Sequence, residues 1–151
     1  MVKIKRALTS GAFYLIHYGN TRLLEEATRL GGPDAKLVVI VARDETIRRL
    51  KGHPPVIPED QRRAVVEALK VVDKVLLGFR ELDMAAVIDR VKPDVIAVGY
   101  DQDGIEAMAR EAIEKRGLKV EVKRISRFAR DDLDSSSKIK RKVFEDRFAS
   151  F

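Results

Sequence analysis

The chain of 151 residues has no cysteine and no tryptophan, and it has only two histidines. The absence of cysteine excludes disulfide bonds, thiolate metal sites and cysteine nucleophiles, and it leaves the redox compartment open. The sequence also lacks a signal peptide and any apolar run of about 18 residues. We therefore expect a cytoplasmic protein with no membrane contact.

Charged side chains are abundant instead. Asp, Glu, Lys and Arg make up 36% of the chain, against roughly 25% in an ordinary soluble domain. Dense ionic composition without cysteine is typical of heat-adapted proteins. The 30 basic and 24 acidic residues give a net charge of +6, which favours an anionic partner. A phosphorylated small molecule meets that requirement as well as nucleic acid does.

Two kinds of segment alternate along the chain. Strands are predicted for five short, β-branched stretches: 3–9, 36–42, 73–78, 94–99 and 118–124. "KLVVIVA" and "DVIAVG" are apolar without a break, which is typical of strands covered on both faces. Segments with helical spacing of apolar residues lie between them. This alternation predicts one doubly wound α/β domain over residues 1–151, with a five-stranded parallel sheet and a C-terminal helix.

Two stretches stand outside the alternation. Residues 43–63 are basic and contain prolines, and they form a long connection between two elements. Residues 126–148 follow the last predicted strand and contain a loop and then an amphipathic helix. We expect this helix to turn its apolar residues inward: Ile139, Val143, Phe144 and Phe148.

The stretch "SGAFYLIHYGN", residues 10–20, joins the first predicted strand to the first predicted helix. Ligands of doubly wound sheets bind at the carboxyl ends of the strands, where the winding direction reverses. Gly11 and Gly19 allow the backbone to approach a ligand, and the following helix start offers free N–H groups to an anion. His17 lies between the glycines, within reach of the same anion. A loop histidine with only a structural hydrogen bond is the alternative interpretation.

Two further segments carry groups that bind phosphate. Lys51, beside Gly52, follows the second predicted strand and can reach toward a phosphate. In "DSSSKI", residues 134–139, Asp134 or Ser135 is a plausible helix N-cap, and consecutive hydroxyls at a helix start also form a phosphate cradle. Two helix N-termini and several cations indicate a polyphosphate ligand, hence phosphoryl or nucleotidyl transfer with Mg²⁺. No Walker lysine motif is present.

Together these segments resemble one family. "SGAFYLIHYGN" resembles the G-x-F-D-x-x-H-x-G-H signature of the cytidylyltransferase-like nucleotidyltransferases. "VVARDETIRRLKG", "IPEDQRRAVVEALKVVDKVLLG", "KPDVIAVGYDQ" and "DSSSKI" follow in the order and spacing of that family. The resemblance runs from Lys3 to about Val143.

The resemblance implies an enzyme that joins a nucleoside triphosphate, ATP or CTP with Mg²⁺, to a phosphorylated acceptor and releases pyrophosphate. Its catalytic residues would be His17, Asn20 and Lys51. Its nucleotide-binding residues would be Gly11, Ala12, Phe13, Gly19, Gly99, Tyr100, Asp101, Gln102, Ser135, Ser136 and Ser137. Its acceptor-binding residues would be Tyr14, Arg43 and Arg130. A homodimer is the assembly it implies, and no tightly bound prosthetic group is expected.

Among subfamilies, the motifs most resemble archaeal FAD synthetases, which adenylylate FMN with ATP. Glycerol-3-phosphate cytidylyltransferases resemble the chain less well. Two positions depart from the signature: its aspartate is Tyr14 here, and its second histidine is Asn20, whose amide can donate one hydrogen bond but carries no charge. These departures leave open a nucleotide-binding regulator without catalysis. The basic segment "KIKRKVFEDR" leaves open a nucleic-acid surface, although a solvated helix face explains it as well.

Overall fold

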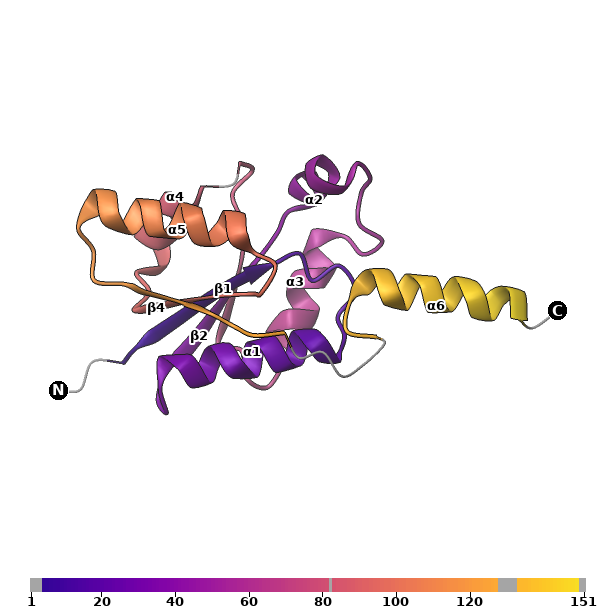
Figure 1. Cartoon of the computed structure of the whole chain (residues 1–151), viewed down its shortest axis with the longest axis horizontal. Helices are drawn as coiled ribbons and strands as arrows, with labels where there is room; N and C mark the ends of the chain where they lie inside the picture. Colours follow the sequence, from indigo (N-terminus) through magenta and orange to yellow (C-terminus); the bar gives the residue numbers. More distant parts are fainter. Residues whose placement is uncertain (1–3, 82, 128–132, 150–151) are drawn as a thin grey trace.

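The computed structural model describes residues 4–81, 83–127 and 133–149, and it forms one parallel sheet between two helical layers (Figure 1). The strands are β1 (Arg6–Gly11), β2 (Lys36–Val41), β3 (Lys74–Leu77), β4 (Val95–Val98) and β5 (Glu121–Arg124). The helices are α1 (Tyr18–Gly31), α2 (Asp44–Lys51), α3 (Glu59–Glu67), α4 (Met84–Val91), α5 (Asp103–Arg116) and α6 (Ser136–Ala149). The strand order is β3-β2-β1-β4-β5, which confirms the doubly wound α/β class.

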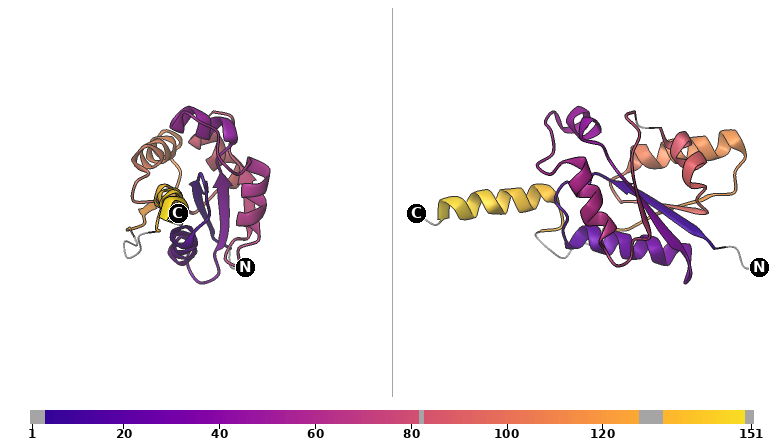
Figure 2. Two further views of the ribbon diagram at one scale, coloured as in Figure 1. Left: turned by 90° about the vertical axis from the view of Figure 1, so that its right-hand side faces the viewer. Right: turned by 180° about the vertical axis from the view of Figure 1, so that it is seen from behind.

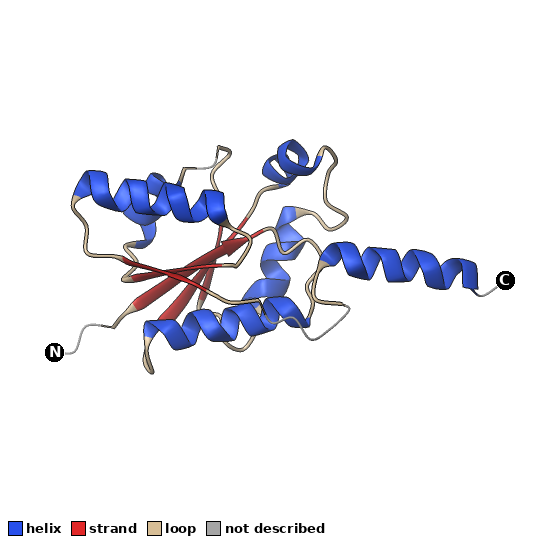
Figure 3. Ribbon diagram, in the orientation of Figure 1, coloured by secondary structure: helices blue, strands red, loops and turns tan. Residues whose placement is uncertain are grey.

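Helices cover both faces of the sheet (Figure 3). Each face buries its own apolar cluster. Successive side chains of β2 alternate between the faces: Leu37 and Val39 pack with α1 and α3, whereas Val38 and Ile40 pack with α4 and α5. This double coverage is the physical reason for the unbroken apolar runs in the sequence. The predicted strands are confirmed, with ends that differ by a few residues.

The winding direction reverses between β1 and β4. These strands pair only at Ala7 with Val95 and at Leu8 with Ile96, whereas β1 continues beside β2 as far as Gly11. The carboxyl ends of β1 and β4 therefore separate and open a crevice. Ligands of open α/β sheets bind in such a crevice.

Helix α6 differs from the sequence-based expectation. In Figure 1 and in the right-hand view of Figure 2, α6 extends away from the sheet, and its C-terminal end lies far from the other helices. Val143 is 65% exposed and Phe144 is 61% exposed, so the prediction that they turn inward is wrong. Ile139 is partly buried, and the side chain of Phe148 lies outside the described residues. Within the described ranges, no helix has the length and apolar character needed to cross a membrane.

The stretch 43–63, expected to be a connection, contains a helix of its own. Helix α2 occupies its first part, and Pro58 immediately precedes α3. Gly52 ends α2 with φ of 78°, a left-handed conformation that glycine adopts without steric cost. The prolines thus lie between two helices and interrupt neither.

Candidate active site

A polar cavity of about 330 Å³ lies at the crevice between β1 and β4. It is bounded by the β1–α1 loop (residues 12–17), the first turn of α1, the segment after β4 and the start of α6. Its lining includes all three residues predicted as catalytic, His17, Asn20 and Lys51. It also includes every residue predicted to bind nucleotide: Gly11, Ala12, Phe13, Gly19, Gly99, Tyr100, Asp101, Gln102, Ser135, Ser136 and Ser137. The structure thus brings together segments that are more than a hundred residues apart.

His17, the partly buried residue that immediately precedes α1, lines this cavity. Its Nδ1 atom is buried and has no hydrogen-bond partner among the described residues. Burial lowers the pKa of His17, and the nearby Asp134 carboxylate partly opposes that effect. The imidazole is therefore neutral near pH 7 in the free protein.

Gly19 is required by close packing. A Cβ atom at this position would lie 2.9 Å from Cε1 of His17 and 3.0 Å from the backbone oxygen of Asp134. Any larger residue would displace the histidine ring or separate α1 from the segment that precedes α6. Gly19 therefore fixes the distance between the two helix N-termini.

Asn20 stabilises the turn that presents His17. Its Oδ1 accepts a hydrogen bond of 3.1 Å from the backbone N–H of His17. The backbone N–H of Asn20 in turn donates to the carbonyl of His17 at 3.0 Å. With its oxygen engaged in this way, the side chain has its NH₂ group left to donate.

Phe13 gives the β1–α1 loop its sharp bend. It has φ of 49°, a left-handed conformation that is uncommon for a residue other than glycine, and its side chain is 4% exposed. Such strain costs of order 1–3 kcal/mol and occurs most often at functional sites. The buried ring holds the loop in this conformation.

The first turn of α6 is attached directly to the same loop. Ser135 caps the helix, since its Oγ accepts from the backbone N–H of Lys138 at 3.2 Å. The Ser136 hydroxyl accepts from the N–H of Leu15 at 3.1 Å and donates to its carbonyl at 3.3 Å. Two helix N-termini thus face one cavity, where their free N–H groups favour an anion.

Asp134 is the acidic residue at this junction. Its carboxylate accepts from Nζ of Lys138 at 2.6 Å and from the guanidinium of Arg127 at 3.3 Å. The hydrogen bond from Lys138 is the main reason that its pKa lies below the ordinary value. Most of its charge is therefore compensated within the protein.

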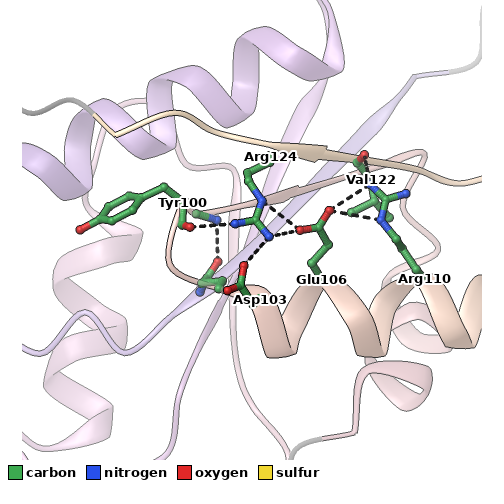
Figure 4. Close-up of polar contacts among 8 residues, drawn as sticks. Tyr100, Asp103, Glu106, Arg110, Val122 and Arg124 are labelled. Atoms are coloured by element: carbon green, nitrogen blue, oxygen red, sulfur yellow. Dashed lines mark hydrogen bonds and ion pairs between the residues drawn. The ribbon is translucent and has the colours of Figure 1, made fainter.

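The loop after β4 is fixed by Gln102 and by a network on α5. Gln102 accepts from the N–H of Gly99 at 2.8 Å and donates to the carbonyl of Ser10 at 2.9 Å, which bridges the ends of β4 and β1. Arg124 of β5 donates to the carbonyl of Tyr100 at 2.8 Å and pairs with Asp103 and Glu106 (Figure 4). This arrangement positions the Tyr100 segment along one wall of the cavity.

Tyr14 lines the polar cavity although it is only 4% exposed. Nζ of Lys51 lies 4.5 Å from the centroid of its ring, and Nζ of Lys140 lies 4.7 Å from it. His53 approaches edge-on, with the ring centroids 6.1 Å apart. Lys51 is the last residue of α2 and Lys140 belongs to α6, so the ring lies where three parts of the chain meet.

A second, larger cavity of about 520 Å³ adjoins the first. Its walls are mainly apolar, and they come from the carboxyl ends of β1 and β2 and from α2, α4 and α5. The apolar lining residues include Ile40, Ile47, Met84, Val87, Ile105 and Met108. It shares six lining residues with the polar cavity: Ser10, Gly11, Ala12, Lys51, Asp101 and Gln102. Sequence reasoning missed this cavity because its apolar residues are indistinguishable from core residues until the helices are placed.

Arg62 holds the shared wall in position. Its side chain is fully buried and donates to the carbonyls of Ala12 and Ala42, each at 2.7 Å. It also donates to the carbonyl of Ile57 at 2.9 Å and to the carboxylate of Asp44 at 2.6 Å. One guanidinium thereby joins the β1–α1 loop, the end of β2 and the segments on both sides of α2.

The structure places neither of the two arginines predicted to bind the acceptor at a cavity. Arg43 donates from Nε to the carbonyl of Gly78 at 2.6 Å and precedes α2, and it lines neither cavity. Arg130 lies outside the described residues. A contact from Arg43 to the acceptor stays a prediction, and the structure gives its side chain a role in holding the β3–α4 loop.

The polar cavity offers few metal ligands. Over residues 4–81, 83–127 and 133–149, no group of three or more His, Asp or Glu side chains is arranged to hold a metal ion. The fold and this site together define a class of protein that handles a polyphosphate at the reversal point of a doubly wound sheet.

Comparisons with known proteins narrow the class. The cytidylyltransferase-like family matches residues 8–142. The FAD synthase of Methanopyrus kandleri is 45% identical over 141 residues, which cover 93% of each chain. The FAD synthase of Ferroglobus placidus is 48% identical over 136 residues, which cover 90% of this chain and 86% of the relative. A crystal structure described as the lipopolysaccharide core biosynthesis protein from Thermoplasma volcanium superimposes with a TM-score of 0.75 at 40% identity, covering 83% of this chain and 99% of that one.

The chain belongs to the cytidylyltransferase-like family, and it is a nucleotidyltransferase. The family resemblance drawn from the sequence motifs is confirmed. Membership favours an enzyme over the nucleotide-binding regulator that Tyr14 and Asn20 left open.

Proposed function

We propose that this nucleotidyltransferase transfers AMP from ATP to FMN and releases pyrophosphate. The observation that carries the proposal is the apolar cavity of about 520 Å³ that opens onto the polar cavity through a shared wall. A flat, largely apolar ring system such as that of a flavin matches this volume and lining. The FAD synthases that the chain resembles support the same substrate pair.

In this proposal the triphosphate of ATP occupies the polar cavity and the flavin ring occupies the apolar one. An oxygen of the FMN phosphate attacks the α-phosphorus of ATP, a new P–O bond forms, and the bond to pyrophosphate breaks. The attacking phosphate is already anionic, so no protein base has to remove a proton. The work of the protein is to position the two reactants and to stabilise charge on the α-phosphate.

His17 is the residue we assign to that stabilisation, with Asn20 and the N-terminus of α1 beside it. The imidazole of His17, whose pKa burial lowers in the free protein, takes up a proton when a phosphate approaches, and the imidazolium then donates to a phosphate oxygen. The Asn20 amide contributes a neutral donor. The hydroxyls of Ser135 and Ser137 at the start of α6 are assigned to the outer phosphates, because Ser136 already bonds to Leu15.

Mg²⁺ is part of the proposal as an ion that arrives with ATP. Mg²⁺ commonly keeps several waters and binds phosphates together with one or two carboxylates. Asp101 lines both cavities and is placed to be such a carboxylate. The chemistry that the ion supplies is neutralisation of charge on the triphosphate.

Glycerol 3-phosphate with CTP is the alternative pair. A small polyol phosphate would leave the apolar walls of the larger cavity uncovered, so the cavity favours FMN. A cytoplasmic location and a homodimer, both expected from the sequence, remain parts of the proposal.

The test is pyrophosphate release in the presence of Mg²⁺. ATP and CTP are each combined with FMN and with glycerol 3-phosphate, and His17→Ala serves as the control. Formation of FAD from ATP and FMN, lost in His17→Ala, supports the proposal. Turnover with glycerol 3-phosphate and none with FMN would overturn it.

A further inference from the structure

Three polar or charged residues are buried in the part of the chain that the structure describes: Thr9, Thr46 and Arg62. Two of them have partners, since Arg62 donates to three carbonyls and a carboxylate and the Thr9 hydroxyl donates to the carbonyl of Ala97 at 2.9 Å. Thr46 is 7% exposed, and its hydroxyl has no hydrogen-bond partner among the described residues. Most buried polar groups of folded proteins are paired, so this hydroxyl calls for an explanation.

Thr46 is the third residue of α2, and it lines the apolar cavity of about 520 Å³. Its oxygen is not enclosed by protein, because Nδ1 of His17 is the one fully enclosed side-chain polar atom without a partner over the described ranges. Ile47 and Leu50 of the same helix also line this cavity. The Thr46 hydroxyl is therefore an open polar group in a mainly apolar wall.

A ligand that fills the apolar cavity removes water from this hydroxyl. If the ligand presents only carbon there, the hydroxyl loses its hydrogen bonds to water and gains none, which weakens binding. If the ligand presents a carbonyl oxygen or a ring nitrogen, a new hydrogen bond offsets the loss. The cavity therefore favours a largely apolar ligand with a hydrogen-bond acceptor facing α2.

The ring system of a flavin has this distribution of polarity. Its dimethylbenzene edge is apolar, and the opposite edge carries two carbonyl oxygens and ring nitrogens. The walls that α4 and α5 give to the cavity include the apolar side chains of Met84, Val87 and Met108. A flavin with its apolar edge toward α4 and α5 and its heteroatom edge toward α2 matches both sides of the cavity.

We propose that Thr46 recognises the ring of the acceptor, and that its hydroxyl donates a hydrogen bond to an acceptor atom on the heteroatom edge of the flavin. This bond sets the orientation of the ring in the apolar cavity. The assignment rests on the proposed adenylylation of FMN and deepens it, because it names the group that distinguishes a flavin from an apolar ring of the same size.

The test is a fluorescence titration of the protein with FMN and with lumiflavin, a flavin ring that carries a methyl group in place of the ribityl phosphate. Thr46→Val removes the hydroxyl and keeps the shape of the side chain, whereas Thr46→Ser keeps the hydroxyl. Thr46→Val is expected to weaken the binding of both ligands by about five- to twentyfold, and Thr46→Ser to stay within about threefold of the parent. Weaker binding of FMN alone would assign the hydroxyl to the ribityl phosphate, and unchanged binding of both would leave it without a ligand. Either result would overturn the proposal.

A control variant removes a hydroxyl elsewhere. The hydroxyl of Thr28 on α1 donates to the carbonyl of Leu24 at 3.0 Å, and Thr28 lines neither cavity. Thr28→Val is expected to bind FMN and lumiflavin as the parent does. A loss of affinity as large as that of Thr46→Val would show that the effect is not specific to the cavity.

Folding stability separates recognition of a ligand from a structural role. Thr46→Val removes a hydroxyl that bonds to no described group, so its urea midpoint of unfolding is expected to equal or exceed that of the parent. Thr9→Val is the matched comparison, because it takes a donor from the carbonyl of Ala97, and its midpoint is expected to fall. An equal fall in Thr46→Val would show that the hydroxyl stabilises the fold, and it would overturn the proposal.

The titration also separates this inference from the proposed function. Binding of FMN and lumiflavin that depends on Thr46, in a protein that forms no FAD, would overturn the proposed reaction and leave the flavin contact standing. Formation of FAD by a protein whose flavin binding is indifferent to Thr46→Val would do the reverse.

Discussion

Arg62 heads the fully buried side chains of the described residues when they are ranked by volume, and it carries a charge. Its partners are three carbonyls and the carboxylate of Asp44, and they come from the β1–α1 loop, the end of β2, the start of α2 and the segment after α2. Removing one member of such a buried network leaves its other members without partners. The side chain thus joins folding stability to the geometry of the site.

Arg62→Met is expected to lower the free energy of unfolding by about 3–5 kcal/mol, measured by urea denaturation. Arg63→Met is the matched control, since Arg63 is half-exposed and pairs with Glu67 on the next turn of α3. Arg63→Met is expected to lower the free energy of unfolding by under about 0.5 kcal/mol. Similar losses for the two variants would show that the guanidinium network contributes no stability of its own.

The protonation of His17 predicts a pH dependence of ATP binding. Its pKa is lowered in the free protein. In the proposed function a phosphate bound beside the imidazole raises this pKa again, so binding takes up a proton. Affinity for ATP is therefore expected to increase as the pH falls from about 8 to about 6.5. Titrations across this range are compared for the parent and for His17→Asn.

In His17→Asn, the affinity for ATP is expected not to increase as the pH falls. His53→Asn, which changes an exposed histidine, is expected to retain the increase. The ionisation of ATP itself is common to all three proteins and cancels in the comparison. A pH dependence that His17→Asn preserves would assign the proton to another group.

The contrast between His17 and Arg62 shows where sequence reasoning succeeds at this scale. The place of His17 beside a cavity was predictable because its glycines, its strand and its helix are adjacent in the chain. Arg62 stands beside Arg63 in a basic run, and nothing local distinguishes them. Its burial depends on carbonyls contributed by segments up to 50 residues away.

At the scale of elements, the periodicity of apolar residues predicts the strands and the helices that cover the sheet. It fails to describe two helices correctly, α2 and α6. Helix α2 was missed because it buries only Thr46 and Ile47, while Leu50 is 75% exposed. Helix α6 was predicted, but its apolar residues were expected to pack inward. Its first turn is attached through Ser136, and the rest extends beyond the sheet (Figure 1).

Val143 of α6 is accordingly expected to contribute little to folding. Val143→Ser should change the free energy of unfolding by less than about 0.5 kcal/mol. Val66→Ser, at a fully buried position of α3, is expected to cost more than about 2 kcal/mol. Both are measured by urea denaturation at low protein concentration. A large loss in Val143→Ser would mean that α6 is covered in solution.

At the scale of the whole molecule, the reversal of strand order divides the carboxyl edge of the sheet into two cavities. The polar one lies between the β1–α1 loop and α6, and the apolar one lies among α2, α4 and α5. Gly11 and Ala12 belong to both, so the end of β1 forms part of the wall of each cavity and, in the proposed function, is where the two reactants meet. The general place of this site was predictable from the alternation of elements, whereas the apolar half required the packed helices.

If each substrate occupies its own cavity, the binding of FMN and the binding of ATP can be weakened separately by mutation. Met108→Trp reduces the volume of the apolar cavity and is expected to raise the KM for FMN by about tenfold or more, while the KM for ATP changes by less than about twofold. Met108→Leu conserves volume and is expected to leave both values near those of the parent. A rise in the KM for ATP equal to that for FMN would contradict the assignment of cavities.

The hydrogen bond between Leu15 and Ser136 joins residues that are 121 positions apart in the sequence. Because the chain is synthesised from its N-terminus, the two cavities are completed at different times during translation. The lining of the apolar cavity runs from Leu8 to Met108, whereas the polar cavity also requires Asp134 to Ser137. On the ribosome, the lining of the apolar cavity, which is the proposed flavin site, is therefore fully translated while the polar cavity, the proposed triphosphate site, still lacks one wall. A nascent chain halted before α6 would contain every residue that lines the apolar cavity and would lack the wall that Asp134–Ser137 give to the polar one.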